Sequence, residues 1–371
     1  MRIAMALLAF SLVGAGCGDD GNDAAPGVDA SGGTDAPAVT GLYEAAGSYE
    51  YDVRVPAPLT YIDVTGAPRD VPFALYVPRT APRPMPIVLV SHGGSDGKTN
   101  ALTSLPEWAE MFARAGFLTV AIAHGARSAA SYTALCAQVG YDPALSECGF
   151  KINWDRPHDV THVLDRLEQL ATTPQLQGML DLDHIGYLGH SAGAGAAMMA
   201  AGARRNYYCS WPFAASGAAP CDAAMLVSRR QTRIDAVVAM SPQGPLSDGF
   251  MSESFPTVEI PVLAATGQRD GNVADGEPAN RTSLFPLLPA GGKYLLYVDD
   301  PGAVHTLFGG ELASCTATAS GVRCQEMRSW LFSAATAFFD AELRERAEGR
   351  AWLASDAIVD ASQGTATWTR R

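Results

Sequence analysis

HIGYLGHSAGAGAAM, residues 184–198, joins a short apolar run directly to an alanine-rich helical pattern. At its centre Gly189 and Gly193 flank Ser191 in a G-x-S-x-G arrangement. A strand-to-helix reversal this sharp forces the central residue into a strained conformation, and glycines on either side leave room for it. We therefore expect a strand, a tight turn and a helix, with Ser191 projecting at the edge of a sheet.

The segments around this turn predict an α/β architecture. Apolar runs typical of buried strands alternate with helical patterns, which favours a mostly parallel sheet with helices on both faces. The expected strands are 86–93, 117–125, 184–190, 234–241, 261–267 and 293–300, and the expected helices are 101–116, 155–172, the segment from 192 onward and 327–348. Before them, Gly66-Ala67-Pro68 separates two alternating runs, as in a hairpin. Ligands of such sheets bind at the carboxyl ends of the strands.

A serine in this position needs a base to activate it and a carboxylate to orient the base. In chain order the acid and then the histidine are expected after later strands. Asp270 follows the strand 261–267, and His305 follows the strand 293–300 and is the only histidine after Ser191. Further candidates for the acid are Asp275, Asp299 and Asp300. Taken singly, Ser191 could be a helix N-cap, Asp270 a turn residue and His305 a surface residue.

The loop SHGGSDG, residues 91–97, permits two interpretations. Followed by Lys98-Thr99, it resembles a phosphate-binding loop, but the spacing from Gly93 to Gly97 is one residue too short for that motif. Alternatively it supplies one of two backbone N–H groups that stabilise an oxyanion, the other coming from the residue after the serine. We favour the second interpretation, with N–H donors from Ala192 and Gly94 and with Ser95 as the alternative to Gly94.

Two histidines, His158 and His162, are spaced i, i+4 on an expected helix, as in some zinc sites. The general-base glutamate of that motif is replaced by Asp159, and no third ligand is evident. We therefore expect no metal site and no cofactor.

The amino terminus has the pattern of an export signal over residues 1–16: a basic Arg2, an apolar run and small residues before Cys17. Small residues before a cysteine resemble the lipobox of bacterial lipoproteins, although Gly14 stands where leucine is usual. This resemblance implies lipidation of Cys17, attachment to a membrane surface and a place in the cell envelope, or secretion if the signal is simply cleaved.

Composition suggests the remaining organisation. Residues 17–48 are rich in Gly, Ala, Pro and Asp and should form a flexible tether, residues 49–355 a single folded domain, and residues 356–371 a tail. The net charge of −13 and the lack of a basic stripe argue against nucleic-acid binding. We expect a monomer.

The six cysteines after Cys17 form three close pairs, as expected of an exported protein with local disulfides. The pairing we expect is Cys136–Cys148, Cys209–Cys221 and Cys315–Cys324, out of 15 possible connectivities.

Five segments together resemble the α/β-hydrolase superfamily: VLVSHGG, RPHDVTHVLDRL, IGYLGHSAGAGAAM, TGQRDGNV and GAVHTLF. Within it, the chain looks like the secreted bacterial branch related to dienelactone hydrolases, platelet-activating-factor acetylhydrolases and polyester hydrolases. The resemblance implies a nucleophile at Ser191, an acid at Asp270, a base at His305 and oxyanion amides at Gly94 and Ala192. The chain differs from this branch at the elbow, where Ala192 follows the serine instead of the usual aromatic residue or Met. It also has serine at position 191, whereas true dienelactone hydrolases use a cysteine nucleophile.

These observations predict a serine carboxylic-ester hydrolase that acts on a small or polymeric ester. A serine peptidase with the same triad and a non-catalytic surface binding protein with this fold are the alternatives.

Overall fold

Strand β5 (Met85–Ser91) illustrates why the protein is built around a sheet covered on both faces. The structure is a computed structural model that describes residues 39–94, 97–138, 151–207, 222–271 and 278–371. In β5, Ile87 and Leu89 belong to one buried cluster, whereas Val88 and Val90 belong to another. Successive side chains of a strand point to opposite faces, so an apolar residue at every position requires cover on both sides.

The central sheet has nine strands in the order β1-β4-β6-β5-β7-β10-β11-β12-β13. The six strands from β6 to β12 run parallel, and β1, β4 and β13 are antiparallel to their neighbours. The predicted mostly parallel sheet is therefore confirmed. Its remaining strands are β1 (Tyr51–Arg54), β4 (Phe73–Pro78), β6 (Leu118–Ile122), β7 (Leu180–His190), β10 (Ala236–Met240), β11 (Val262–Gly267), β12 (Lys293–Val298) and β13 (Ala366–Arg370).

Two small sheets accompany it. The predicted hairpin is present as β2 (Leu59–Ile62) paired antiparallel with β3 (Pro68–Val71), and β8 (Arg204–Arg205) pairs with β9 (Val227–Ser228).

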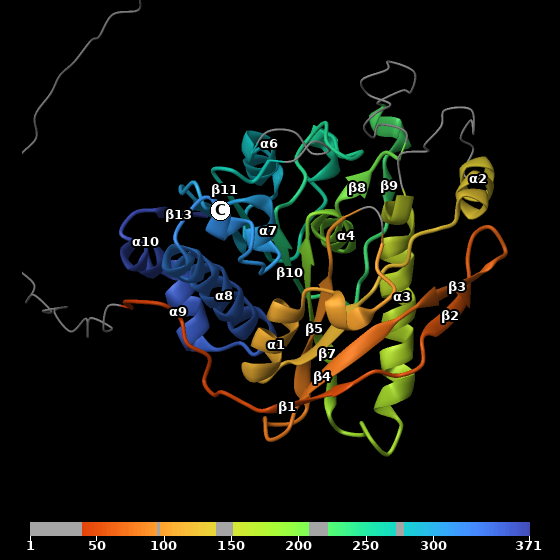
Figure 1. Cartoon of the computed structure of the whole chain (residues 1–371), viewed down its shortest axis with the longest axis horizontal. Coiled ribbons are helices and arrows are strands. Elements are labelled where there is room, and N and C mark those ends of the chain that lie inside the picture. Colours follow the sequence, from red (N-terminus) through yellow and green to blue (C-terminus); the bar gives the residue numbers. More distant parts are fainter. Residues whose placement is uncertain (1–38, 95–96, 139–150, 208–221, 272–277) are drawn as a thin grey trace, which may run out of the picture. The chain divides into compact units, whose positions relative to one another are not determined.

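Helices cover both faces of the sheet, as predicted (Figure 1). Helices α3 and α4 bury their apolar side chains in the cluster on one face, whereas α1, α8 and α9 bury theirs in the cluster on the other. The helices are α1 (Pro106–Arg114), α2 (Ala129–Gln138), α3 (Lys151–Ala171), α4 (Ala192–Ala200), α6 (Pro278–Thr282), α7 (His305–Phe308), α8 (Gly321–Leu343), α9 (Ala347–Ala354) and α10 (Ala357–Ala361), with single 3₁₀ turns at Ala101–Thr103, Ala223–Met225, Ser252–Ser254, Phe285–Leu287 and Cys315–Ala317.

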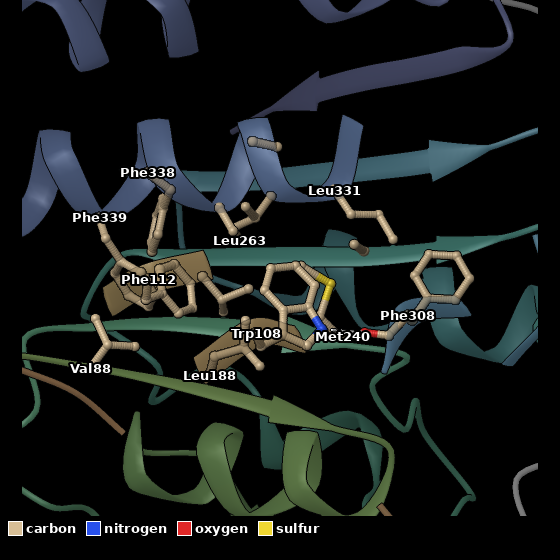
Figure 2. Close-up of a cluster of buried hydrophobic side chains, with 14 of the residues drawn as sticks. Val88, Trp108, Phe112, Leu188, Met240, Leu263, Phe308, Leu331, Phe338 and Phe339 are labelled. Carbon is tan, nitrogen blue, oxygen red and sulfur yellow. Dashed lines mark hydrogen bonds between the residues drawn. The ribbon is translucent and has the colours of Figure 1, made fainter. Parts of the chain in front are cut away.

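An aromatic cluster between α1, α8 and the sheet fixes the position of α7 (Figure 2). Trp108 and Phe112 of α1 are fully buried, and the ring of Phe112 meets that of Phe339 edge-on at 5.3 Å. Such an aromatic pair contributes about 0.5–1.5 kcal/mol beyond its area burial. The indole N–H of Trp108 donates to the backbone carbonyl of Phe308 at 3.1 Å. The core thus holds the short helix that begins at His305.

The C-terminal residues correct one prediction. Residues 356–371 were expected to form a tail, but they contain α10 and the edge strand β13, which pairs with β12. Trp368 stacks on Tyr294 at 5.4 Å and donates from its indole N–H to the carbonyl of Leu353. Only two side chains of this five-residue strand are buried, so the sequence has too little periodicity to predict a strand there.

The predicted tether also ends earlier than expected. Residues 39–371 form one compact unit, so residues 39–48 belong to the domain. The Tyr43 hydroxyl donates to Asp340 at 2.8 Å, and the carbonyl of Gly41 accepts from the Trp352 indole at 3.0 Å. These contacts with α8 and α9 require tertiary structure and have no signature in a Gly- and Ala-rich sequence.

Helix boundaries differ from the predicted ones as well. The helix expected over 327–348 begins at Gly321, where the hydroxyl of Ser320 accepts from the N–H of Arg323, and is interrupted after Leu343. The helix expected over 101–116 is a 3₁₀ turn followed by α1. No helix in the described ranges is both long and apolar enough to cross a membrane.

Candidate active site

The turn between β7 and α4 places Ser191 in a conformation that few residues adopt. Its backbone has φ 53° and ψ −119°. A Cβ atom on Gly189 would lie 2.0 Å from the carbonyl oxygen of Gly193, and one on Gly193 would lie 2.2 Å from that of Ser91. Only glycine fits at both positions, so steric exclusion accounts for the spacing seen in the sequence. Ser191 occupies the N-cap position of α4, but its side chain makes no capping hydrogen bond to the described backbone of that helix.

Asp270 and His305 meet at the same edge of the sheet. Asp270 follows β11, His305 begins α7 after β12, and these strands run parallel to β7, so their carboxyl ends share an edge. Oδ1 of Asp270 lies 2.7 Å from Nδ1 of His305. Because an ionised carboxylate only accepts hydrogen bonds, Nδ1 carries the proton, and Nε2 is the nitrogen that can act as a base.

The surroundings of the two side chains suit this pairing. Asp270 is fully buried, and its Oδ2 accepts from the hydroxyl of Thr266 at 2.7 Å, whereas the His305 side chain is 20% exposed. A carboxylate anchored on both oxygens holds the imidazole in one orientation. Of the other acid candidates, Asp299 accepts from Gln268 and Asp300 pairs with Arg323, while Asp275 lies outside the described residues.

His190 links the elbow to this pair. Its Nε2 donates to the backbone carbonyl of His305 at 2.9 Å, and the two ring centroids are 4.8 Å apart. Burial, followed by the nearby charge of His305, holds the pKa of His190 well below 6.5. His190 is therefore a neutral hydrogen-bond donor throughout the physiological range.

Arg281, on α6, was not predicted from the sequence. It is fully buried, and its guanidinium donates to the carbonyls of Asp270 at 2.5 Å and Ser241 at 2.6 Å. Its Nε also lies 3.3 Å from Oδ1 of Asp270. The residue therefore holds the backbone of Asp270 and places a cation beside its carboxylate, but nothing in the local pattern around 278–282 indicates this.

The predicted oxyanion loop follows β5 and abuts the elbow. A Cβ on Gly93 would lie 2.9 Å from Cβ of Ser191, so the backbone of this loop passes directly beside the serine. Gly94 has φ 81° and open space where a Cβ would project, so its conformation rather than crowding favours glycine. Ala192, the other predicted donor, is the first residue of α4. Ser95 lies outside the described residues.

A second serine, histidine and aspartate form a hydrogen-bonded chain beneath this loop. The hydroxyl of Ser91 lies 2.8 Å from Nε2 of His124, whose Nδ1 lies 2.9 Å from Oδ2 of Asp159. All three are fully buried, and the Tyr187 hydroxyl donates to Ser91 at 2.8 Å. Because no side chain of the set reaches solvent, we interpret it as a structural network.

The charges around that network support the same interpretation. Asp159 also accepts two hydrogen bonds from Arg69, at 2.8 Å each, and one from Tyr61. Hydrogen bonds from Arg69 and His124 hold the pKa of Asp159 below its usual range despite burial, while burial lowers the pKa of His124 to about 4. His124 is thus neutral and Asp159 ionised at neutral pH. A histidine at the end of the strand 117–125 was the only sequence signal for this set.

The paired histidines of α3 do not converge on a metal site. His162 stacks on Tyr61 at 4.0 Å between ring centroids, whereas His158 lies beside Trp154. In the described part of the chain, no group of three or more His, Cys, Asp or Glu side chains is arranged to hold a metal ion.

One of the three predicted disulfides is present, and the other two involve cysteines outside the described residues. Cys315 and Cys324 are bonded and fully buried. Cys136 is disulfide-bonded, but its expected partner Cys148, together with Cys209 and Cys221, lies outside the described residues, as does Cys17.

Comparison of the sequence with models of known protein families and with curated proteins found no match to either. The chemistry of the site is therefore inferred from its own geometry.

Proposed function

We propose that this protein is a serine hydrolase of carboxylic esters with an α/β-hydrolase fold. The observation that carries the proposal is the 2.7 Å contact between Asp270 and His305, on the same sheet edge as the strained Ser191. The strand order and the helices on both faces are compatible with this fold. A buried carboxylate bonded to a partly exposed imidazole is the arrangement that a serine nucleophile requires.

In the proposed mechanism, Nε2 of His305 takes the proton from the Ser191 hydroxyl as its oxygen attacks the ester carbonyl carbon. The resulting oxyanion accepts hydrogen bonds from the N–H groups of Ala192 and Gly94. His305 then protonates the departing alcohol, which leaves an acyl group on Ser191. Water, deprotonated by the same nitrogen, attacks the acyl carbon. As the bond between that carbon and the Ser191 oxygen breaks, His305 returns the proton to this oxygen and the acid is released. Asp270 accepts the hydrogen bond from Nδ1 and orients the imidazole throughout. These side chains suffice for the reaction, so the mechanism uses no cofactor.

The test is hydrolysis of p-nitrophenyl esters, from acetate to palmitate, by purified protein. We expect activity that is lost in Ser191→Ala and falls by about 10⁴-fold in Asp270→Asn, because the amide N–H can donate to Nδ1 and stabilise the wrong tautomer of the imidazole. The preferred chain length would report the depth of the acyl site. Cleavage of peptides but not esters would indicate a serine peptidase, and no reaction with either substrates or a serine-directed phosphonate would indicate a binding protein.

We also propose that the chain is exported and anchored through a lipid on Cys17. Support comes from the signal-like residues 1–16 and from the buried Cys315–Cys324 disulfide, because such bonds persist in oxidising compartments. Metabolic labelling with a radioactive fatty acid should mark the wild-type protein and not Cys17→Ser. Labelling of both, or of neither, would contradict the anchor.

A further inference from the structure

Arg156 of α3 reaches under the loop that follows β5. The side chain is fully buried. One terminal nitrogen donates to the carbonyl of His92 at 2.5 Å, and the other donates to the carbonyl of Gly94 at 2.9 Å. One planar guanidinium therefore donates hydrogen bonds to two carbonyls of the same short loop, those of residues 92 and 94.

In this respect Arg156 differs from two nearby buried arginines. Arg69 and Arg127, on the same side of the sheet, both bind carboxylates, namely Asp159 and Asp155. Among the described residues, no carboxylate lies within ion-pair distance of Arg156, and no acceptor pairs with its Nε. Burial lowers the pKa of Arg156 to about 10, so the group is still charged at neutral pH. Asp159 and Asp248 favour the charged form from beyond ion-pair distance, but the groups that Arg156 contacts directly are carbonyl oxygens. A buried charge with no carboxylate in contact is costly, which points to a function for these hydrogen bonds.

The geometry of the peptide unit relates this contact to the reaction. In a trans peptide the C=O and N–H bonds point in opposite directions. The carbonyl of His92 faces Arg156, so the N–H of Gly93 faces away from it. The carbonyl of Gly93 accepts from Nδ1 of His92 at 2.7 Å, so the N–H of Gly94 is directed away from that ring. With all three carbonyls held, the loop cannot rotate a carbonyl oxygen toward Ser191 without breaking one of these hydrogen bonds.

We propose that Arg156 is the positioning residue of the oxyanion loop: by holding the carbonyls of His92 and Gly94, it fixes the two peptide units that flank the one carrying the Gly94 N–H, which the proposed mechanism directs at the oxyanion. The proposal rests on the proposed hydrolase function. Its consequence is specific: losing Arg156 should weaken stabilisation of the transition state more than binding of the substrate, because the oxyanion forms only during reaction.

The test compares Arg156→Lys and Arg156→Met with Arg166→Met, a matched control on a partly exposed arginine of the same helix. With a p-nitrophenyl ester, we expect kcat to fall 10- to 1,000-fold in Arg156→Met while KM changes less than about threefold. Arg156→Lys should recover part of kcat, because an ammonium can reach one carbonyl but not bridge both. Inhibition by an alkyl boronic acid, which forms a tetrahedral adduct, should weaken in proportion to kcat/KM.

Hydrogen exchange of the peptide covering residues 91–98 provides a readout that does not depend on activity. It should accelerate in the Arg156 variants and not in Arg166→Met. A folded Arg156→Lys with unchanged kcat, or with a rise in KM alone, would overturn the proposal, as would unchanged exchange in the loop. If Arg156→Met does not fold, the lysine variant decides. A wild-type protein inactive on every ester would refute the hydrolase function instead, and the exchange measurement would then decide whether Arg156 holds the loop.

Discussion

The ring of His190 donates a hydrogen bond to the backbone carbonyl of His305, although 115 residues separate them in the chain. His190 directly precedes Ser191, so the residue that enters the elbow also fixes the backbone of the proposed base. This hydrogen bond couples the position of the elbow to that of the proposed base. A displacement of Ser191 should therefore also displace His305.

Replacing His190 with Phe tests this link. Phe preserves an aromatic ring but cannot donate to His305. Because small misplacements of a base are costly, we expect kcat to fall on the order of 10- to 100-fold with little change in the fold. Steady-state kinetics beside circular dichroism would check it. Unchanged kcat in a folded variant would show that α7 is held by other contacts, such as that between Trp108 and Phe308.

Ser191→Ala and Ser91→Ala should behave in opposite ways. Loss of Ser191 should reduce kcat by about 10⁴-fold or more without lowering stability much. Loss of Ser91 should preserve most activity but destabilise the fold by ~1–3 kcal/mol, because Tyr187 and His124 lose a buried partner. Ester assays and urea unfolding of both variants would decide, and an inactive but stable Ser91→Ala would reverse our assignment of the two serines.

Arg281→Met should affect both stability and turnover. It leaves the buried carbonyls of Asp270 and Ser241 without their donor and removes the cation beside the Asp270 carboxylate. We expect a loss of roughly 3 kcal/mol in unfolding free energy and a lower kcat. Arg281→Lys, which retains the charge, is the control. Equal stability of wild type and Arg281→Met in urea would contradict this account.

His158 should make stability depend on pH. Burial, followed by the charge of Arg229, lowers its pKa from the ordinary value of 6.5 to about 4. Between these values the unfolded chain binds the extra proton, so stability is present above pH 6.5 and falls as the pH is lowered towards 4, by up to ~1.4 kcal/mol per pH unit. His158→Phe should flatten that slope. It should also preserve stability at pH 7.5, because Nε2 of His158 has no partner among the described residues.

Urea unfolding from pH 7.5 to pH 4 would measure this effect. His184→Gln is a control of opposite sign, because a hydrogen bond to Asp181 raises the pKa of His184. That contribution is present below pH 6.5 and lost as the pH rises, and it should be small because the side chain is exposed. Parallel curves for wild type and His158→Phe would refute the prediction.

The disulfide between Cys315 and Cys324 joins the 3₁₀ turn Cys315–Ala317 to the first turn of α8. Replacing both cysteines with serine should lower unfolding free energy by about 2–3 kcal/mol, from the larger conformational entropy of the unfolded chain. Differential scanning calorimetry would show the shift. Alkylation of unreduced protein under denaturing conditions should label none of the six cysteines after Cys17, and one labelled thiol would contradict the three-pair scheme.

The local sequence was sufficient to predict the features of this protein that depend on residues close together in the chain. Gly189 and Gly193 predict the elbow because a Cβ at either would collide within a few residues or with the adjacent strand. Continuous apolar runs predict the buried strands, because successive side chains point to opposite faces of a sheet that is covered on both. Chain order and a single downstream histidine predict Asp270 and His305 as candidates, which the structure brings to 2.7 Å.

Only the tertiary structure decided which distant side chains support that site. The hydrogen bonds from Arg156, Arg281 and His190 go to backbone carbonyls of other segments. Every residue has a backbone carbonyl, so the sequence does not indicate which one a distant side chain will contact. The network of Ser91, His124 and Asp159 could not be predicted, because it forms only where the end of β5, the end of β6 and α3 meet in the fold. The edge strand β13 depended on burial of Trp368 against Tyr294 rather than on its own pattern. Such contacts arise when the whole chain packs, so local periodicity cannot encode them.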